Sequence, residues 1–130
     1  MGKINGVHHI ALKPNKEVYA KAVDFYSNVL GCEIVRQWGE GDQAGCMLSC
    51  GDNTVMEILH GDYDGTKNFG AHNHIAFSVD EVDSFLEEIR AAGYEVTMEP
   101  TEVNIGGTYL VRVAFFMGPV GESVELFKEL

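Results

Sequence analysis

The chain has 130 residues, of which 45% are hydrophobic and 22% charged, a balance typical of a globular protein and unlike that of a disordered one. Twenty acidic residues outnumber nine basic ones, which gives a formal net charge of −11. This excess excludes nucleic acid and anionic membrane surfaces as expected partners, because both require clustered Lys and Arg. The longest apolar stretch, residues 109–117, contains Arg112 and is too short to cross a bilayer.

The cellular compartment is predicted from the N-terminal residues and the cysteines. Residues 1–6 contain no apolar signal core, so we do not expect export. Three cysteines, Cys32, Cys46 and Cys50, form no Cys-x-x-Cys motif and are predicted to be reduced thiols. Together these features predict a cytoplasmic protein.

The first half of the chain predicts one strand, one helix and three further strands. A short apolar run beginning at His9 predicts the first strand. Apolar residues then recur at helical spacing from Val18 to Val29, and Gly31 is a plausible end of that helix. Strands are expected near 32–35, 44–50 and 54–60, and the polar segment 61–70 is predicted to be a linker.

The second half repeats this order about 65 residues later. His74 begins a run like that at His9, and helical spacing from Val82 to Ile89 ends at Gly93. Asp80 and Asp83 are both possible N-caps of this helix. Strands are expected near 94–97, 109–117 and 123–128. Each half therefore predicts a βαβββ module, with approximate bounds 5–62 and 71–130 in a single domain of residues 1–130.

Four residues recur at equivalent positions of the two halves: His9 and Glu57 in the first, His74 and Glu125 in the second. Because side chains alternate along a strand, each His shares a face with small or polar neighbours, where it is available as a ligand. Two imidazoles and two carboxylates suit a divalent transition metal and leave positions open for water or substrate. A single such His or Glu is more often structural, so the repetition of both residue types carries the prediction.

Several longer strings resemble the vicinal oxygen chelate superfamily, and within it the short bacterial glyoxalase I group. They are residues 7–12 around His9, the Phe-Tyr-x-x-Val-Leu-Gly string at 25–31, residues 74–80, and the Gly-Pro-x-Gly-x-x-x-Glu-Leu string at 118–126. The resemblance implies an α+β fold in which two paired βαβββ modules form a curved eight-stranded mixed sheet around a metal site. It also implies one divalent ion, Ni, Co, Zn or Mn, on His9, Glu57, His74 and Glu125. A homodimer with the site shared between chains is a further implication.

The activity implied by this resemblance is the isomerisation of a hemithioacetal, formed from a 2-oxoaldehyde such as methylglyoxal and a thiol such as glutathione, through an enediolate. Glu125 is the first candidate for the base that moves the proton, and Glu57 is the second. Lys13 stands where the family has a glutathione-binding Arg, and is the expected substrate-binding residue. Gly61 replaces an Asn of the glyoxalase group, which leaves open whether glutathione or another thiol is used.

Two other functions remain open. A methylmalonyl-CoA epimerase-like enzyme would use the same scaffold, but its usual ligand at the position of Glu57 is Gln. A non-catalytic, resistance-type module that binds a small molecule would not need the four metal residues. Trp38 could cover a substrate pocket or pack in the core or a dimer contact, and the Gly106–Gly107 pair could be a mobile loop or a hairpin turn.

Overall fold

The computed structural model describes residues 2–3, 5–64, 66 and 72–130. It divides into two compact units, Met1–Gly65 and Thr66–Leu130. Each unit contains one α-helix and a four-stranded mixed sheet, so the α+β prediction and the two βαβββ modules are confirmed. The eight strands pair as two sheets of four, one in each unit. No helix among the described residues is long and apolar enough to cross a membrane.

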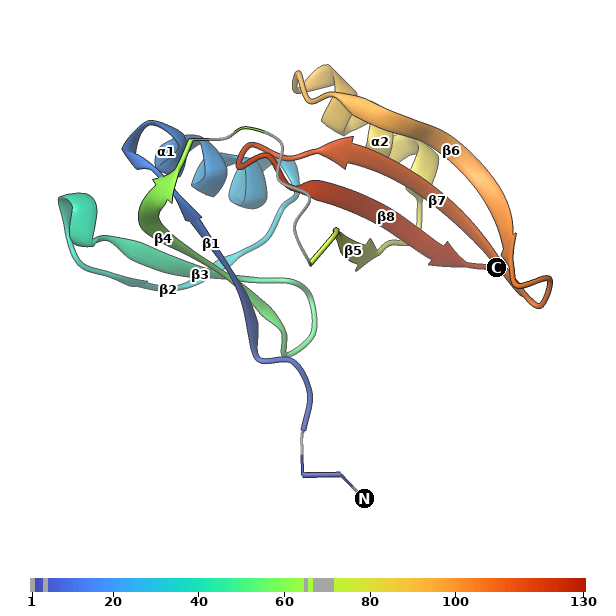
Figure 1. Ribbon diagram of the computed structural model, residues 1–130, viewed down its shortest axis with the longest axis horizontal. Coiled ribbons are helices and arrows are strands. Elements are labelled where there is room, and N and C mark those ends of the chain that lie inside the picture. Colours follow the sequence, from blue (N-terminus) through green and yellow to red (C-terminus); the bar gives the residue numbers. More distant parts are fainter. Residues whose placement is uncertain (1, 4, 65, 67–71) are drawn as a thin grey trace. The chain divides into compact units, whose positions relative to one another are not determined.

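The first unit has the strand order β1-β4-β3-β2 (Figure 1). Its strands are β1 (His9–Pro14), β2 (Ile34–Trp38), β3 (Gly45–Ser49) and β4 (Val55–Tyr63). The central strand β4 pairs in parallel with β1 and antiparallel with β3, which in turn pairs antiparallel with the edge strand β2. Parallel pairing of β1 with β4 requires a crossover, and the helix α1 (Lys16–Asp24) begins that connection.

Local interactions define both ends of α1. The Asn15 side chain accepts a hydrogen bond from the Val18 amide and caps the N-terminus. The helix continues into a π-helical turn, η1 (Phe25–Val29). Gly31 follows with a φ of +77°, in the left-handed region where glycine commonly ends a helix. Phe25 and Tyr26 of this turn are fully buried, and α1 itself lies against β4 and β1. A single-turn 3₁₀ segment, η2 (Gly41–Gln43), lies between β2 and β3.

The second unit repeats the arrangement with the strand order β5-β8-β7-β6. Its strands are β5 (Ile75–Ser78), β6 (Val96–Ile105), β7 (Tyr109–Met117) and β8 (Ser123–Glu129). Helix α2 (Val82–Ala91) packs against β6, β7 and β8 through Val82, Leu86 and Ile89, all of them buried. The equivalence of the two sheets, β1-β4-β3-β2 and β5-β8-β7-β6, confirms the internal repeat.

Two local predictions are wrong. Neither Asp80 nor Asp83 caps α2; the N-cap is Glu81, which makes no side-chain cap bond. Asp83 instead accepts two hydrogen bonds, each 2.6 Å long, from the Arg112 guanidinium, and this ion pair lowers the pKa of Asp83. The segment 61–63 is not linker but the end of β4, and most of the remaining predicted linker lies outside the described residues.

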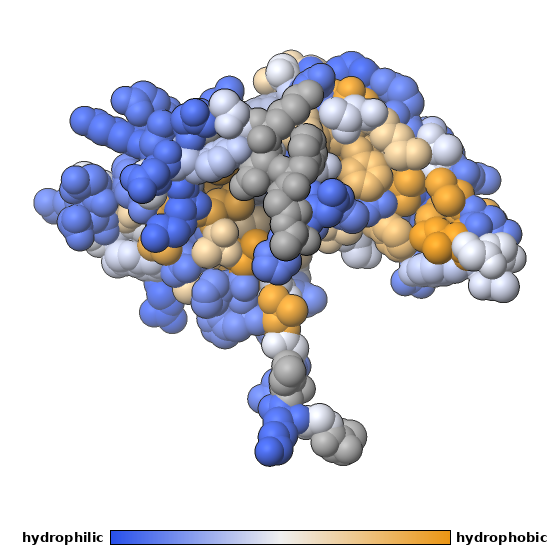
Figure 2. All heavy atoms as spheres, in the orientation of Figure 1, coloured by the Kyte–Doolittle hydropathy of each residue, from blue (hydrophilic) through white to orange (hydrophobic). Residues whose placement is uncertain are grey.

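Exposed apolar side chains gather at one end of the second unit, around the β6–β7 turn and the C-terminus (Figure 2). They are Ile105, Tyr109, Leu110 and Leu130, which we call the hairpin-tip patch. The turn itself is formed by Gly106 and Gly107, both with positive φ, and the Gly107 amide donates to the Asn104 carbonyl oxygen. The glycine pair is therefore a hairpin turn in this structure.

Candidate metal centre

The first unit brings His9 and Glu57 together on one face of its sheet. The register pairs His9 with Val55 and Ala11 with Glu57, so the His and the Glu point to the same side. The His9 Nε2 atom lies 3.6 Å from Glu57 Oε1. The imidazole is 40% exposed and the carboxylate 15%, which leaves the ring open to a ligand above a largely covered carboxylate.

The second unit brings His74 and Glu125 together in the same way. Ala76 pairs with Glu125, and His74 lies two residues before Ala76, as His9 lies two before Ala11. The His74 Nε2 atom lies 3.1 Å from Glu125 Oε1, with 36% and 10% of the two side chains exposed. The two His–Glu pairs thus have equivalent registers, and in both of them the Nε2 atom of the His faces the carboxylate. The repetition in the sequence predicts this equivalence.

The other ring nitrogen of each His is held by the residue that precedes it. The Nδ1 atom of His74 lies 2.9 Å from the Asn73 Oδ1 atom, and that of His9 lies 2.9 Å from the His8 Nδ1 atom. An amide oxygen only accepts hydrogen bonds, so His74 Nδ1 carries the hydrogen and donates it to Asn73. A ring with its only hydrogen on Nδ1 has its lone pair on Nε2, the atom that faces Glu125, and this is the tautomer that a metal ligand needs.

The hydrogen bond at Nδ1 indicates whether a cation fits between the His and the Glu of a pair. A nitrogen lone pair and a carboxylate oxygen repel each other at 3.1 Å unless a proton or a metal ion supplies positive charge between them. The His74–Glu125 pair therefore suits a divalent ion, which replaces that proton. Within the described part of the chain, the possible ligands occur as pairs, and no group of three or more His, Cys, Asp or Glu stands close enough to hold an ion.

Glu125 differs from Glu57 in its surroundings. It is the one charged residue among those described that is buried, with 8% of its surface exposed. The Phe115 residue pairs with Glu125 across β7 and β8, and its ring meets the His74 ring edge-on, with centroids 5.3 Å apart. Burial raises the pKa of the Glu125 carboxyl, while His74 acts in the opposite direction. Glu125 is consequently the more strongly desolvated carboxylate of the two pairs.

Lys13 lies near the end of β1, on the strand that His9 begins. A Cβ atom added to Gly61 would stand 2.6 Å from both the Cβ atom and the carbonyl oxygen of Lys13. The two positions that depart from the glyoxalase pattern are therefore in contact, and the backbone here leaves no room for a side chain at residue 61. The exposed Lys13 side chain places an ammonium group on the edge of this sheet.

Three further residues complete the Glu57 face of the first sheet. Met47 pairs with both Glu57 and Arg36, so all three lie in one row across β4, β3 and β2. Trp38 pairs with Gly45 in the neighbouring row, and its indole fills the space that a Cβ atom on Gly45 would occupy. Within the described part of the chain, Arg36 has no ion-pair partner. This face thus combines a carboxylate, an apolar floor, a planar ring and a cation at its edge.

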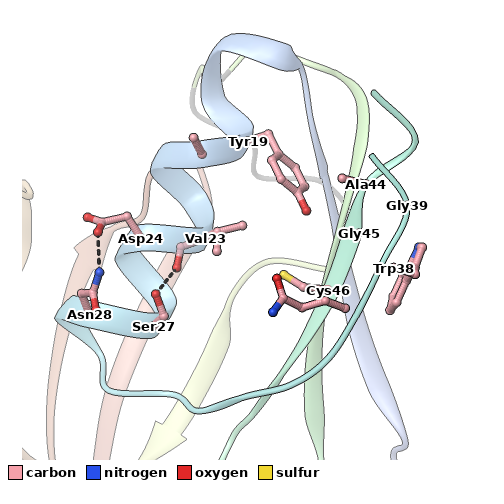
Figure 3. Close-up of a pocket in the computed structure, with 12 residues that line it drawn as sticks. Tyr19, Val23, Asp24, Ser27, Asn28, Trp38, Gly39, Ala44, Gly45 and Cys46 are labelled. Atoms are coloured by element: carbon pink, nitrogen blue, oxygen red, sulfur yellow. Dashed lines mark hydrogen bonds between the residues drawn. The ribbon is translucent and has the colours of Figure 1, made fainter. Parts of the chain in front are cut away.

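A cavity of about 700 Å³ lies on the opposite face of the same sheet, toward α1 (Figure 3). The Tyr19 hydroxyl points toward Cys46 in this cavity, whereas the Trp38 ring lies on the far side of the β2 strand. Burial, together with the Cys46 thiol to which Tyr19 is hydrogen-bonded, raises the pKa of Tyr19 to about 12. Cys46 neighbours Met47 along β3, and successive strand residues point to opposite faces, so this cavity is separate from the His9–Glu57 pair.

The comparison with protein families matches residues 6–126 to the model described as "Glyoxalase/Bleomycin resistance protein/Dioxygenase superfamily". The chain belongs to this superfamily. It is 31% identical over 114 residues to a probable lactoylglutathione lyase of Vibrio cholerae, covering 83% of this chain and 80% of that protein. It is 32% identical over 115 residues to the lactoylglutathione lyase of Escherichia coli O157:H7, covering 84% and 83% of the two chains.

Several solved structures share the fold of this chain. A glyoxalase/dioxygenase from Nostoc punctiforme superposes with a TM-score of 0.77 at 20% identity, covering 99% of this chain and 94% of that one. TnmS3, an antibiotic binding protein from Streptomyces sp. CB03234, superposes with a TM-score of 0.75 at 17% identity, covering all of both chains. At these identities the similarity establishes the fold of this superfamily member and not its ligand.

Sequence reasoning did not place three side chains that lie near the two His–Glu pairs of this superfamily member. Asn73 and His8 hold the ring nitrogens of the two His residues, and Arg36 lies in the row of Glu57. The position directly before each His was a signal available in the sequence, because a polar residue occurs there in both halves. The sequence did not indicate the face of the sheet on which Arg36 lies, because that face depends on a register shift between Ile34 and Arg36.

Proposed function

We propose that this chain is a metal-dependent lyase of the glyoxalase I type, which isomerises the hemithioacetal of a 2-oxoaldehyde and a small thiol. One observation carries the proposal. A His Nε2 atom faces a Glu Oε1 atom in each unit, at 3.6 Å and 3.1 Å, and the preceding side chain holds each Nδ1 atom. Holding a His and a Glu this close together costs free energy unless a cation binds them. The same pair in both units is therefore expected if the two pairs belong to one set of metal ligands.

We propose that His9, Glu57, His74 and Glu125 together hold one divalent ion. Two imidazoles and two carboxylates suit Ni, Co, Zn or Mn, and the absence of cysteine from the set speaks against a closed structural zinc site. A bound ion would supply Lewis acidity toward the substrate oxygens. The similarity to lactoylglutathione lyases over more than four-fifths of the chain supports this choice of chemistry.

Glu125 is the proposed base that takes the proton beside the substrate carbonyl and returns it to the neighbouring carbon. Its carboxylate is the more buried of the two, and a desolvated carboxylate holds a proton more readily than an exposed one. Glu57 is the second candidate. His74, 3.1 Å from Glu125, keeps that carboxylate oriented.

The substrate is proposed to be anionic and to lie across the Glu57 face. Lys13 and Arg36 supply positive charge at two edges of that face, while Met47 and Trp38 supply apolar surface between them. Both cations are exposed, so they can pair with carboxylates of the thiol cosubstrate. Lys13 gives a point charge and not the bidentate fork of an Arg, which favours a looser contact with that thiol.

We further propose that the protein is a cytoplasmic homodimer with each site shared between chains. The hairpin-tip patch supports association, because exposed apolar clusters commonly mark protein contacts. Sedimentation velocity of the metal-loaded protein tests this directly. A monomer at micromolar concentration would contradict the dimer and leave the assignment of the ligands to be tested separately.

The experiment for the function is a metal-reconstituted assay with methylglyoxal and glutathione, and with other small thiols in parallel. Turnover is expected with at least one of Ni, Co, Zn or Mn, and loss of turnover is expected in His74→Ala and Glu125→Gln. His72→Ala is the matched control, because His72 is exposed and lies two residues before His74. A parent protein that binds no divalent metal but retains a small molecule would instead support the resistance-type binding module; the structural relative TnmS3 is an antibiotic binding protein.

A further inference from the structure

Two cysteines of the first unit stand opposite each other where the pairing of β2 with β3 ends. Ile34 pairs with Leu48 in an antiparallel register, and the Ser49 amide donates a 2.8 Å hydrogen bond to the Glu33 carbonyl oxygen. Moving one further residue along each chain, from Glu33 and Ser49, brings Cys32 opposite Cys50. The register shift in β2 lies on the other side of Ile34 and does not disturb this pairing.

The backbone hydrogen bonds show whether Cys32 and Cys50 occupy a hydrogen-bonded or a non-hydrogen-bonded position of the antiparallel ladder. The Cys32 amide donates to the Tyr26 carbonyl oxygen and the Cys50 amide to the Thr54 carbonyl oxygen, each over 2.9 Å, so both amides point away from the opposite cysteine. Since Glu33 and Ser49 are joined by a ladder bond, Cys32 and Cys50 occupy the next, non-hydrogen-bonded position. The Cα atoms of such pairs are about 4.5 Å apart, within the range of about 4.4–6.8 Å that disulfides adopt.

The surroundings of the pair leave each thiol no other cysteine within reach. Both thiols are free and half-buried, on the face of the sheet that also carries the buried Leu48. Burial, with a smaller contribution from the neighbouring Cys50, raises the pKa of Cys32 to about 11. Cys46 lies four residues before Cys50 on the same extended strand, about 13 Å away.

We propose that Cys32 and Cys50 form a reversible cross-strand disulfide by exchange with a low-molecular-weight disulfide. One protein thiolate attacks a sulfur atom of the small disulfide and releases one small thiol. The second protein thiolate attacks the resulting mixed disulfide and releases the other. The two protein thiols lose two electrons and two protons, and the small disulfide gains them as two thiols.

This bond would tie the start of β2 to the end of β3, the two strands that carry Trp38 and Met47 on the Glu57 face. It closes a loop of the chain between residues 32 and 50 and removes conformational freedom from the unfolded state. Neither cysteine belongs to a His–Glu pair, so the modification site stands independently of the proposed metal centre and of the proposed reaction.

The test is to incubate the folded, full-length protein with excess oxidised glutathione, alkylate the remaining thiols in denaturant, and map the peptides without reduction. The expected product is one Cys32–Cys50 cross-link with Cys46 fully alkylated. The same cross-link is expected in Cys46→Ser, and only a mixed disulfide with glutathione in Cys32→Ser. The cross-linked protein should unfold at a temperature roughly 5–10 °C higher.

The same oxidation carried out in denaturant is the control for a negative result, because it shows whether the reagent can cross-link these cysteines at all. There the three cysteines are expected to form all three pairings. Complete alkylation of Cys32 and Cys50 after oxidation of the folded protein, while the denatured protein cross-links, would overturn the proposal. A cross-link to Cys46 in the folded protein would overturn it equally.

Discussion

The hydrogen bond from His74 to Asn73 provides the sharpest test of how a metal ligand is positioned. Asn73→Ala removes the acceptor 2.9 Å from Nδ1 and leaves both ring tautomers accessible. An even mixture of tautomers would by itself weaken binding only about twofold, or ~0.4 kcal/mol. The larger effect is the freedom of a 36% exposed ring to rotate. Loss of such hydrogen-bond partners commonly weakens metal affinity about 10–100-fold. Because the edge contact of the His74 ring with Phe115 remains, we expect the affinity to fall about tenfold, at the lower end of this range.

The assay is the dissociation constant of Ni²⁺ or Zn²⁺, measured by competition with a chromogenic chelator. Asn73→Asp is expected to retain the parent affinity, because a carboxylate oxygen also accepts from Nδ1. His72→Ala should behave as the parent. If His74→Ala abolishes binding while Asn73→Ala matches the parent, the account of positioning is wrong. If His74→Ala also binds normally, the ligand assignment itself is wrong.

Three other predictions concern packing and titration in the first unit. Gly61→Ala is expected to lower the free energy of unfolding by about 1–3 kcal/mol, because its Cβ would lie 2.6 Å from the Lys13 backbone oxygen; an unchanged denaturation midpoint would refute the contact. In Gly45→Ala the nearest atoms to the new Cβ belong to the movable Trp38 ring, so less than about 1 kcal/mol of stability should be lost while the emission of this single tryptophan changes; identical spectra would count against that placement. The pKa of Cys32 is about 11 in the folded chain against about 9 unfolded, so the unfolded state binds fewer protons and stability falls as pH rises from 9 toward 11. Denaturation at pH 10 should show this cost, about 1 kcal/mol, reduced or absent in Cys32→Ser; equal pH profiles would contradict it.

The repeat made much of the fold predictable. Helical spacing from Val18 and from Val82, each followed by Gly, marks two βαβββ modules, and the structure contains both. Alternation along the strands also placed each His on an accessible face. The two pairs, His9 with Glu57 and His74 with Glu125, follow because equivalent modules give equivalent registers.

The remaining features depend on tertiary contacts that periodicity does not encode. Asp83 looks like a helix cap by residue type, but Arg112, 29 positions away, binds it. The extension of β4 to Tyr63 reflects pairing with Pro14 and was hidden by a polar composition. The placement of Trp38 over Gly45 depends on the register of β2, which shifts within the strand.

The central claim is that residues of both units hold one metal ion together, and calorimetric titration of the metal-free protein with Ni²⁺ or Zn²⁺ tests it most directly. The account predicts one tight site per chain. It also predicts that Glu57→Gln in the first unit and Glu125→Gln in the second each weaken this site by at least tenfold. Tight binding that survives both substitutions, or two separate weak sites per chain that each respond to one substitution alone, would contradict it.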